Sequence, residues 1–272
     1  MDCKAIIIGK KIVSRKETLE YLSEKHNWQN VVIGISAWYG FLAWILARLM
    51  YRKCIYYCID FYAPTEAEDG IDKVFIWLAM HMDKFLNRHC DDVWDISKTI
   101  DEGRYLYGKY VGQKSRILPL CYSPDYFRFN PPEKRDLLVY VGLDGFGTEL
   151  AKDLENFIWL AKGDLPLNYM LQTLSTCGIG LAMWKTKGNN YYGDSGKSKL
   201  YSACGLPVII TDNTLYSQVI KETQAGLVIP YNKRALRKAV KKIAYNYDFY
   251  KKNVKKTWRY INADEVYQEK GI

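Results

Sequence analysis

Residues 191–211 read YYGDSGKSKLYSACGLPVIIT and combine a turn, a helix and a strand in quick succession. The turn-forming residues at 194–196 predict a helix that begins near Lys197 and ends at Gly205, because glycine is a favourable residue just past a helix end. The apolar run after the proline predicts a strand over residues 208–211. A helix that leads directly into an apolar strand is typical of α/β folds.

The start of this helix can bind an anion. The first backbone N–H groups of a helix have no partner within it, and the helix dipole is positive at that end. A lysine in the first turn is unfavourable for the helix itself, so Lys197 makes most sense beside a bound anion, for which a diphosphate is the natural candidate. The alternative is a solvated lysine at an ordinary helix start, and these residues alone do not exclude it.

Short β-branched or aromatic runs alternate with helical segments along the whole chain. Several of them, such as AIIIG at 5–9 and LLVYVG at 137–142, are continuously apolar, as strands covered on both faces should be. Strands that alternate with helices indicate parallel βαβ units, so we expect an α/β protein with two Rossmann-like, doubly wound parallel sheets. The expected strands cover residues 4–9, 31–35, 54–59, 92–96, 115–119, 137–142, 156–161, 178–183, 207–211 and 226–229.

The break between the two expected domains is rich in proline. Residues 118–136, LPLCYSPDYFRFNPPEKRD, contain four prolines and no periodic pattern after Pro119. In doubly wound sheets ligands bind at the carboxyl ends of the strands, so we expect the ligand in the crevice between the domains. We predict an N-terminal domain over 1–119, a linker over 120–136, a C-terminal domain over 137–255, and a C-terminal helix over 256–272 that packs back on the first domain.

Length and composition limit the class of protein. The chain has 272 residues, 49% hydrophobic and 25% charged, which suits two modest domains and excludes a disordered, collagenous or coiled-coil chain. The N-terminal apolar run is too short for a secretory signal, and Arg48 interrupts the most apolar stretch, so we expect no membrane-spanning helix. The seven cysteines form no CxxC pair, which favours reduced thiols of a cytosolic protein and no metal site.

Basic residues are concentrated near the C-terminus. Residues 233–259 contain eleven Lys and Arg and one acidic residue, a net charge of +10 against +9 for the whole chain. Tyr250, Trp258 and Tyr260 lie among these charges, which suits an anionic membrane surface and would also suit stacking on nucleic-acid bases. A solvated helix face is the simpler alternative. An apolar helix at 41–50 could add a membrane contact, but we interpret it as core.

The stretch at 191–211 and the following DNTLYSQVIKETQAGLVIPY, at 212–231, resemble the donor-site region of GT-B-fold glycosyltransferases of the family 4 and family 1 type. Those proteins have a lysine-bearing helix that ends in a Gly-x-Pro-Val-Ile run, then a helix and a Gly-Leu-Val-Ile-Pro strand. The D-x-x-K-x-K-x-Y pattern at 194–201, IYYCIDFYAP at 55–64 and DKFLNRHCDDVWDIS at 83–97 resemble one bacterial and archaeal subgroup. The resemblance spans most of residues 54–267.

The resemblance implies a GT-B fold whose C-terminal domain binds a nucleotide-diphosphate sugar, a UDP- or GDP-sugar, while the N-terminal domain binds the acceptor. It also implies catalysis without a metal ion or another cofactor. The donor-binding residues that it implies, with the glycine that ends the strand at 137–142, are Asp194, Ser195, Gly196, Lys197, Lys199, Tyr201 and Gly142.

The sequence departs from this family in three ways. Many family 4 enzymes have two glutamates eight positions apart around the donor helix, and the corresponding positions here hold Tyr192 and Leu200. The first βα unit of the donor domain, which carries an Arg/Lys pair in the family, is lost or merged with the second, so Lys152 or Lys162 would have to replace that cation. The chain is also shorter than such enzymes usually are. These departures favour the alternative of a non-catalytic relative that serves as a binding or partner subunit.

The carboxyl ends of the first-half strands supply the candidates for acceptor binding. Asp60 follows the strand at 54–59 and could deprotonate an acceptor hydroxyl, or it is a turn carboxylate. A glycine after the first strand would let the backbone approach a substrate, and Trp38 could stack on a sugar ring or pack in the core. We assign Asp60 as the catalytic candidate and, as acceptor-binding candidates, Gly9, Lys10, Trp38, Tyr39 and Ser97.

Other chemistries lack their motifs. The sequence has no Walker lysine motif and no GxSxG, and the glycines of GLDGFG at 142–147 are not spaced as a dinucleotide fingerprint requires. No D-x-D motif of a manganese-dependent glycosyltransferase is present. We expect a hexosyltransferase-type enzyme that moves a sugar to a hydroxyl of a glycan or lipid-linked acceptor, in the cytoplasm or peripherally at the inner face of the membrane, with no nucleic acid as partner.

Overall fold

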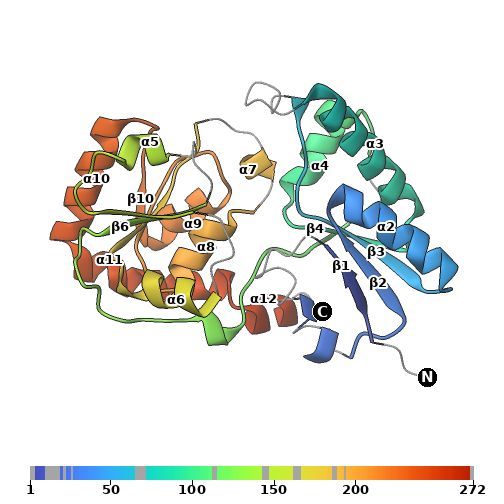
Figure 1. Cartoon of the computed structure of the whole chain (residues 1–272), viewed down its shortest axis with the longest axis horizontal. Coiled ribbons are helices and arrows are strands. Elements are labelled where there is room, and N and C mark those ends of the chain that lie inside the picture. The colour runs from blue at the N-terminus through green and yellow to red at the C-terminus, as the bar shows by residue number, and fades with distance from the viewer. Residues whose placement is uncertain are drawn as a thin grey trace. The chain divides into compact units, whose positions relative to one another are not determined.

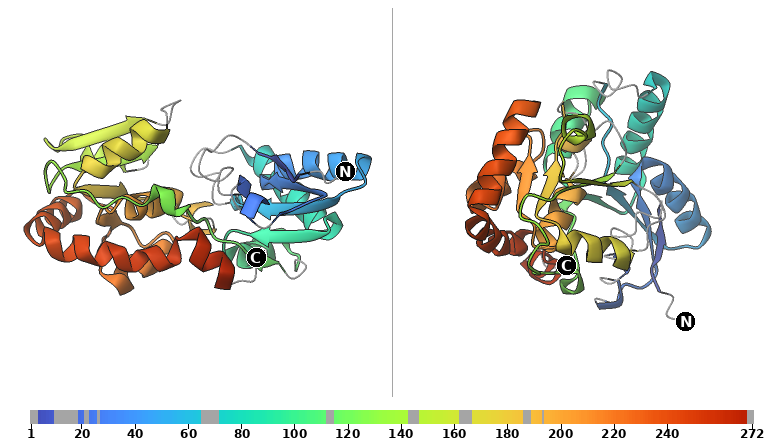
Figure 2. Two further views of the ribbon diagram at one scale, coloured as in Figure 1. Left: turned by 90° about the horizontal axis from the view of Figure 1, so that it is seen from below. Right: turned by 60° about the vertical axis from the view of Figure 1, so that its left-hand side comes forward.

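The structure, a computed structural model of the chain, divides into two compact units (Figures 1 and 2). Unit 1 comprises residues 1–120, 188–194 and 272, and unit 2 comprises residues 121–187 and 195–271. Two of the residues considered above, Lys10 and Lys162, lie outside the described residues. The structure describes residues 4–9, 19–20, 23–25, 27–64, 72–111, 115–142, 147–161, 167–185, 189–192 and 194–269.

The sheet of unit 1 has five parallel strands that lie side by side in chain order. All five strands predicted for the first half of the chain are present, although the fifth is short. The strands are β1 (Ile6–Ile8), β2 (Val31–Ile35), β3 (Lys53–Cys58), β4 (Asp92–Asp95) and β5 (Arg116–Ile117). The helical elements of this unit whose bounds the structure describes are α2 (Ser36–Leu49), α3 (Lys73–His89), α4 (Thr99–Gly103), the π-helical turn η2 (Arg104–Gly108) and α7 (Asn189–Tyr192).

Helix α2 begins directly after β2 and touches the sheet with its backbone. A Cβ atom added to Gly34 on β2 would lie 2.4 Å from the Cα atom of Gly40 on α2. A Cβ atom added to Gly40 would lie 2.8 Å from the ring of Tyr56 on β3. Because real Cβ atoms do not approach other atoms so closely, both glycines are required for this packing.

The sheet of unit 2 also has five parallel strands, all of them predicted. They are β6 (Leu138–Gly142), β7 (Phe157–Ala161), β8 (Ile179–Ala182), β9 (Val208–Ile210) and β10 (Gly226–Val228). The helical elements are η3 (Pro124–Tyr126), α5 (Thr148–Ala151), α6 (Leu167–Thr176), α8 (Gly196–Ala203), α9 (Tyr216–Thr223), α10 (Lys233–Tyr245), α11 (Tyr247–Val254), η4 (Lys255–Tyr260) and α12 (Ala263–Glu269).

The strand order of this second sheet is β10-β9-β8-β6-β7. All strands are parallel, but the side on which the next strand is added changes at β6. The chain runs from β6 to β7 on one side and then returns to β8 on the other, which is the topological switch point of a doubly wound sheet. Strand β6 pairs with β7 from Leu138 to Gly142, but with β8 only at Leu138 and Val139. The pairing between β6 and β8 therefore ends before the carboxyl end of the strands.

Helices cover both faces of this sheet (Figure 1). On one face, Leu138, Tyr140 and Leu181 pack in a core with Leu236 and Ile243 of α10. On the other face the tyrosine ring at position 201 of α8 lies against the backbone at position 180 of β8, where a Cβ atom would lie 2.4 Å from the ring. The expectation of two Rossmann-like parallel sheets is confirmed.

The interpretation of the apolar segment 41–50 as core is correct for only one side of α2. Ala43 and Ala47 are fully buried, whereas Leu42 is 51% exposed and Leu49 is 71% exposed. Across the described ranges, from residue 4 to residue 269 with their gaps, no helix has the length and apolar character needed to cross a bilayer.

The basic segment at 233–259 forms α10, α11 and η4, and most of its charges point to solvent. Two aromatic residues considered for surface contacts do not face outward: Tyr250 is buried, and the Trp258 indole stacks on Phe127 and donates a hydrogen bond to the backbone. The exposed aromatic side chains of the segment are Tyr245 and Phe249. Lys251 is also turned inward, and burial lowers its pKa to about 8.

Candidate functional site

Lys197 lies at the switch point of the second sheet. Its ammonium group donates a hydrogen bond of 2.9 Å to the hydroxyl of Tyr140 on β6, and it lies 4.2 Å from the centroid of that ring. It also lies 5.3 Å from the ring of Trp184, which follows β8. The neighbouring backbone at Gly142 has a φ of +138°, and a Cβ atom there would lie 3.2 Å from the ammonium nitrogen. The structure therefore brings together Lys197 and Gly142 from the predicted donor set.

The first backbone N–H groups of a helix have no partner within it, and Lys197 belongs to the first turn of α8. Ser195 occupies the position before the helix, but its side chain makes no capping hydrogen bond and instead pairs with the Ser198 hydroxyl at 2.6 Å. The carbonyl of Gly196 accepts a hydrogen bond from Tyr122, which fixes the turn from the side of the linker. A positive helix end and a lysine charge thus converge at the carboxyl end of the sheet, an arrangement suited to a phosphate group.

Tyr201 has a structural role in this site. Its side chain is fully buried, and burial raises the pKa of its phenol well above the usual value. The hydroxyl accepts a hydrogen bond of 2.8 Å from the N–H of Val141, a group directed toward the side on which β8 no longer pairs. Tyr201 therefore replaces a missing strand partner and holds the end of β6 in place.

Two other members of the predicted donor set are also tied into the protein. The Asp194 carboxylate accepts a hydrogen bond of 2.9 Å from the Leu120 N–H, and both residues belong to unit 1. Lys199 is almost fully buried, with its ammonium group 5.8 Å from the ring of Tyr216. Lys197 and Lys199 are two residues apart on α8, so their side chains leave the helix in different directions.

The aromatic residues around Lys197 were not among the predicted site residues. Trp184 is held by its backbone, which donates to and accepts from the Thr211 hydroxyl and also accepts a hydrogen bond of 2.7 Å from the Asn213 amide. Tyr140 lies inside an apolar strand, so the sequence alone indicates a core residue. The sequence does carry one signal for Trp184: it lies two residues after the end of β8, where doubly wound sheets bind ligands.

The carboxylate of Glu149 occupies the start of the short helix α5. It accepts a hydrogen bond of 3.1 Å from the Gly147 N–H and another from the Tyr231 hydroxyl. Lys152 lies 5.7 Å from the ring of Trp159, whose indole N–H bonds the carbonyl of Gly142. These contacts stabilise the loops around the switch point.

In unit 1, Asp60 follows β3 in the segment that leads to Phe61, and it is partly exposed. The Ser97 hydroxyl is buried, bonds the hydroxyl of Thr99 and donates to the carbonyl of Tyr192 on α7. Ser97 therefore anchors α7 and is not an open binding group. Tyr192 itself, at one position where family 4 enzymes have a glutamate, is buried against Phe61.

The remaining acceptor candidates lie at the same ends of strands. Gly9 follows β1, and a Cβ atom there would lie 2.9 Å from the side chain of Ile35. Trp38 is partly exposed and stacks on Phe75 of α3, with ring centroids 5.8 Å apart, and Tyr39 is half-buried. The exposure of Trp38 leaves part of its ring accessible to another planar group.

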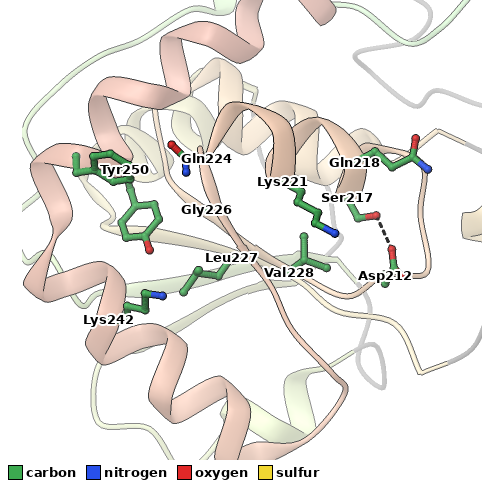
Figure 3. Close-up of a pocket in the computed structure, with 11 residues that line it drawn as sticks. Asp212, Ser217, Gln218, Lys221, Gln224, Gly226, Leu227, Val228, Lys242 and Tyr250 are labelled. Carbon is green, nitrogen blue, oxygen red and sulfur yellow. Dashed lines mark hydrogen bonds between the residues drawn. The ribbon is translucent and has the colours of Figure 1, made fainter.

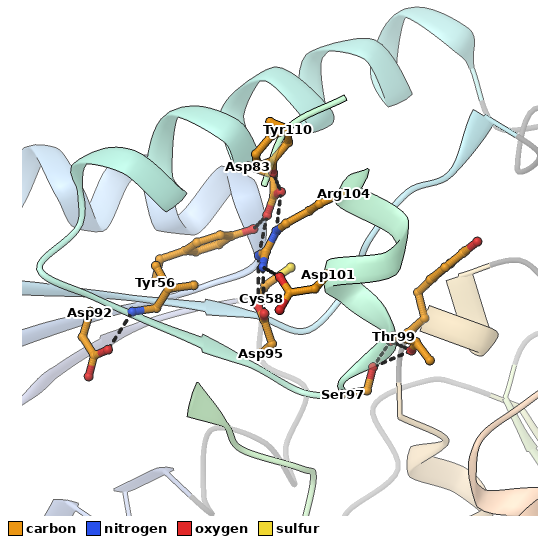
Figure 4. Close-up of polar contacts among 12 residues, drawn as sticks. Tyr56, Cys58, Asp83, Asp92, Asp95, Ser97, Thr99, Asp101, Arg104 and Tyr110 are labelled. Atoms are coloured by element: carbon orange, nitrogen blue, oxygen red, sulfur yellow. Dashed lines mark hydrogen bonds and ion pairs between the residues drawn. The ribbon is translucent and has the colours of Figure 1, made fainter. Parts of the chain in front are cut away.

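Unit 1 contains a buried ionic cluster centred on Arg104 (Figure 4). Arg104 of η2 is fully buried and bonds Asp95 through two nitrogens, at 2.7 and 2.9 Å, and Asp83 at 3.0 and 3.1 Å. Burial raises the pKa of Asp95 to about 6 despite the arginine. Burial would raise the pKa of Asp83, but the charge and hydrogen bonds of Arg104, together with hydrogen bonds from Tyr110 and Tyr56, lower it. The cluster connects η2, α3 and β4.

A separate pocket of about 610 Å³ lies on the outer side of the edge strand β10 (Figure 3). Lys221 of α9, Lys242 of α10 and Tyr250 of α11 contribute to its lining. This pocket is separated from β6 by two strands and does not include Lys197. We place the candidate site at the switch point because the Lys197 ammonium group and the positive end of α8 are there.

Among the described residues, no group of His, Cys, Asp and Glu side chains is arranged to hold a metal ion. The six described cysteines are free and buried.

No protein-family model and no curated protein matches this sequence. Solved structures do match it. Sucrose-phosphate synthase from Thermosynechococcus elongatus has a TM-score of 0.63 at 13% identity, over 94% of this chain and 75% of that one. HepE from Anabaena, in complex with UDP, has a TM-score of 0.62 at 10% identity, over 94% and 81%. AviGT4, a glycosyltransferase involved in avilamycin A biosynthesis, has a TM-score of 0.52 at 12% identity, over 89% and 73%.

These structures define the class of fold: the chain has two Rossmann-like parallel sheets of the GT-B type, and the expected fold is confirmed. At such low identities the likeness concerns the fold, and the family 4 subgroup remains a prediction.

Proposed function

We propose that this protein is a glycosyltransferase that transfers a sugar from a nucleotide-diphosphate sugar to a hydroxyl acceptor. One observation carries the proposal: the Lys197 ammonium group and the N-terminus of α8 meet at the switch point of the second sheet, beside Tyr140 and Trp184. A doubly wound sheet binds its ligand at this point, and both features favour an anion there. HepE, which has the same fold, has been solved with UDP and with UDP-glucose, and this supports a nucleotide sugar as the donor.

In the proposed reaction, negative charge develops on the diphosphate as the bond to the sugar breaks. Lys197 and the N–H groups of α8 would stabilise that charge, and they need no reorganisation because Tyr140 and Trp184 already hold the lysine in place. Asp60, in unit 1, is the proposed base that receives the proton of the acceptor hydroxyl. We further propose a UDP- or GDP-hexose as donor, a glycan or lipid-linked acceptor, and transfer without a metal ion.

The test is the affinity of nucleoside diphosphates, measured by calorimetry on the parent protein and on Lys197→Met. Loss of a charge-assisted contact costs about 1.5–3 kcal/mol, so affinity should fall roughly ten- to a hundredfold. Lys221→Met is the matched control, because Lys221 is exposed on α9 and lines the edge pocket. Equal affinity of the Lys197 variant and the parent would refute the assignment.

A second candidate function is that of a non-catalytic binding subunit. It is favoured because this chain lacks glutamates at the two positions where many family 4 enzymes have them. Here those positions hold Tyr192 and Leu200, and both side chains are buried. A subunit of this kind could still bind a nucleoside diphosphate through Lys197. Hydrolysis of UDP- and GDP-sugars by the parent, absent from Lys197→Met, would exclude it. Diphosphate binding with no hydrolysis and no transfer would favour it.

A further inference from the structure

Helices α2 and α3 of unit 1 pack side by side (Figure 1). Both helices carry large apolar side chains that are exposed. Their contact is made by aromatic rings, since Phe85 of α3 meets Phe41 and Trp44 of α2 edge to face. Six large apolar side chains outside this aromatic contact have exposed fractions between 38% and 71%. We define the α2–α3 apolar face by Leu42, Leu46, Leu49, Val74, Trp77 and Leu78.

Spacing places the exposed apolar side chains of each helix on one side of that helix. On α2 the exposed leucines follow at intervals of four and three residues, and on α3 the exposed large apolar residues lie at 74, 77 and 78. Residues at such intervals lie on one side of a helix. The opposite side of α2 carries Ala43 and Ala47, buried against the sheet. Monomeric proteins rarely expose so many large apolar side chains together unless the surface binds something.

The charges around the face favour an anionic surface as its partner. Helix α2 contains no acidic residue, and the single acidic residue within α3, Asp83, is buried with Arg104. Arg48, Lys73 and Arg88 are exposed on the two helices. Two described acids lie close to these helices in the sequence: Asp72 caps α3, and Asp91 pairs with Arg48 at 4.0 Å. The exposed charges that the structure describes on the two helices are basic, so these charges would repel each other if two copies met face to face.

We propose that the α2–α3 apolar face docks on the surface of an anionic lipid bilayer. The leucines and Trp77 would enter the interfacial region, where tryptophan is favoured, and the basic side chains would meet lipid headgroups. This surface lies in unit 1 and is separate from the basic segment of unit 2. The inference does not depend on the proposed transferase activity, because it uses no residue of the donor site.

The test measures partitioning of the protein to sedimented vesicles without any nucleotide. The vesicles are phosphatidylcholine alone, or phosphatidylcholine with phosphatidylglycerol in roughly a 7:3 ratio. The parent should bind the anionic vesicles, and Leu42→Gln/Leu46→Gln/Leu49→Gln should reduce the partition constant roughly tenfold or more, because three apolar contacts are lost. The variant should fold normally, since these leucines are already exposed and glutamine is a good helix former.

The control is Leu106→Gln/Val111→Gln/Tyr169→Gln, which removes three exposed apolar side chains outside the face and should bind as the parent does. Trp77→Phe should weaken the shift of tryptophan emission that accompanies binding. The proposal is overturned if the leucine variant and the parent partition equally. It is also overturned if light scattering shows a parent dimer that the leucine variant abolishes while vesicle binding is unchanged, because the face would then bind a second copy.

Discussion

At the scale of single residues, the donor motif contains side chains with different roles. Lys197 points to the switch point, whereas Lys199 and Tyr201 are buried and Asp194 is bonded to the linker. All four lie within eight residues of sequence, and the motif pattern does not distinguish a ligand-binding side chain from a structural one. Sequence spacing could therefore locate the site, but it could not separate the group that meets a ligand from the groups that hold the backbone.

We predict that Tyr201→Phe destabilises the protein and weakens nucleotide binding together. Removal of the hydroxyl leaves the N–H of Val141 without its partner, and an unsatisfied buried polar group costs about 1–3 kcal/mol. Urea unfolding measures the loss, and calorimetry with nucleoside diphosphates measures affinity. Tyr245→Phe, at an 87% exposed position, is the control and should change neither. Unchanged stability of Tyr201→Phe would show that this hydrogen bond is not needed.

We predict that Asp60→Asn lowers the rate of sugar transfer and leaves nucleotide affinity nearly unchanged. Asp60 belongs to unit 1, whereas Lys197 belongs to unit 2, so the amide should affect proton removal and not donor binding. Single-turnover kinetics and calorimetry separate the two effects. Asp125→Asn, at an exposed position in the linker, provides the control. A variant that binds and transfers as the parent does would remove Asp60 from the mechanism.

At the scale of secondary-structure elements, sequence reasoning was most successful with strands. Continuous apolar runs such as those at β6 and β9 mark strands covered on both faces, and all ten predicted strands are present. The cluster around Arg104 could not be predicted in this way. Its members come from α3, β4, α4 and η2, and no local pattern indicates that separate segments meet at one guanidinium group.

We predict that Arg104→Met strongly destabilises unit 1. The substitution leaves the carboxylates of Asp83 and Asp95 buried without their cation, and breaking a buried ion pair costs about 3–5 kcal/mol. Arg116→Met is the matched control, because Arg116 is 62% exposed and its pair with Asp92 is an ordinary surface pair worth below about 1 kcal/mol. Chemical denaturation followed by circular dichroism compares them. Similar losses for the two variants would contradict this account.

At the scale of the whole molecule, positive charge is distributed unevenly. The segment at 233–259 carries a net charge of +10, so the rest of the chain is close to neutral. The structure turns most of these charges outward on α10, α11 and η4, with Tyr245 and Phe249 exposed among them. We therefore retain the prediction of an electrostatic contact with an anionic membrane, now with a different pair of aromatic residues from those indicated by the sequence.

We predict that vesicle binding has a salt-sensitive part that depends on this segment. Each basic residue near an anionic surface contributes about 1 kcal/mol, and screening acts over about 10 Å at 0.1 M salt. Lys238→Gln/Lys241→Gln/Lys242→Gln should therefore weaken binding to anionic vesicles at low salt and have less effect at moderate salt. The control removes three exposed lysines elsewhere, Lys4, Lys134 and Lys221, and should retain binding. Equal effects of both triple variants would assign the binding to net charge alone.

The backbone contact between β2 and α2 has a consequence for tracing the ancestry of this chain. Side chains can drift during evolution when their neighbours shift to compensate, but at Gly34 the obstacle to any larger residue is the backbone of Gly40. Distant homologues should therefore keep this pair, six positions apart at a strand end and a helix start, long after most other positions have changed. When overall identity has fallen to about one residue in ten, as with the solved structures of the same fold, two glycines at this interval are a better marker of common descent than the lysine-rich surface.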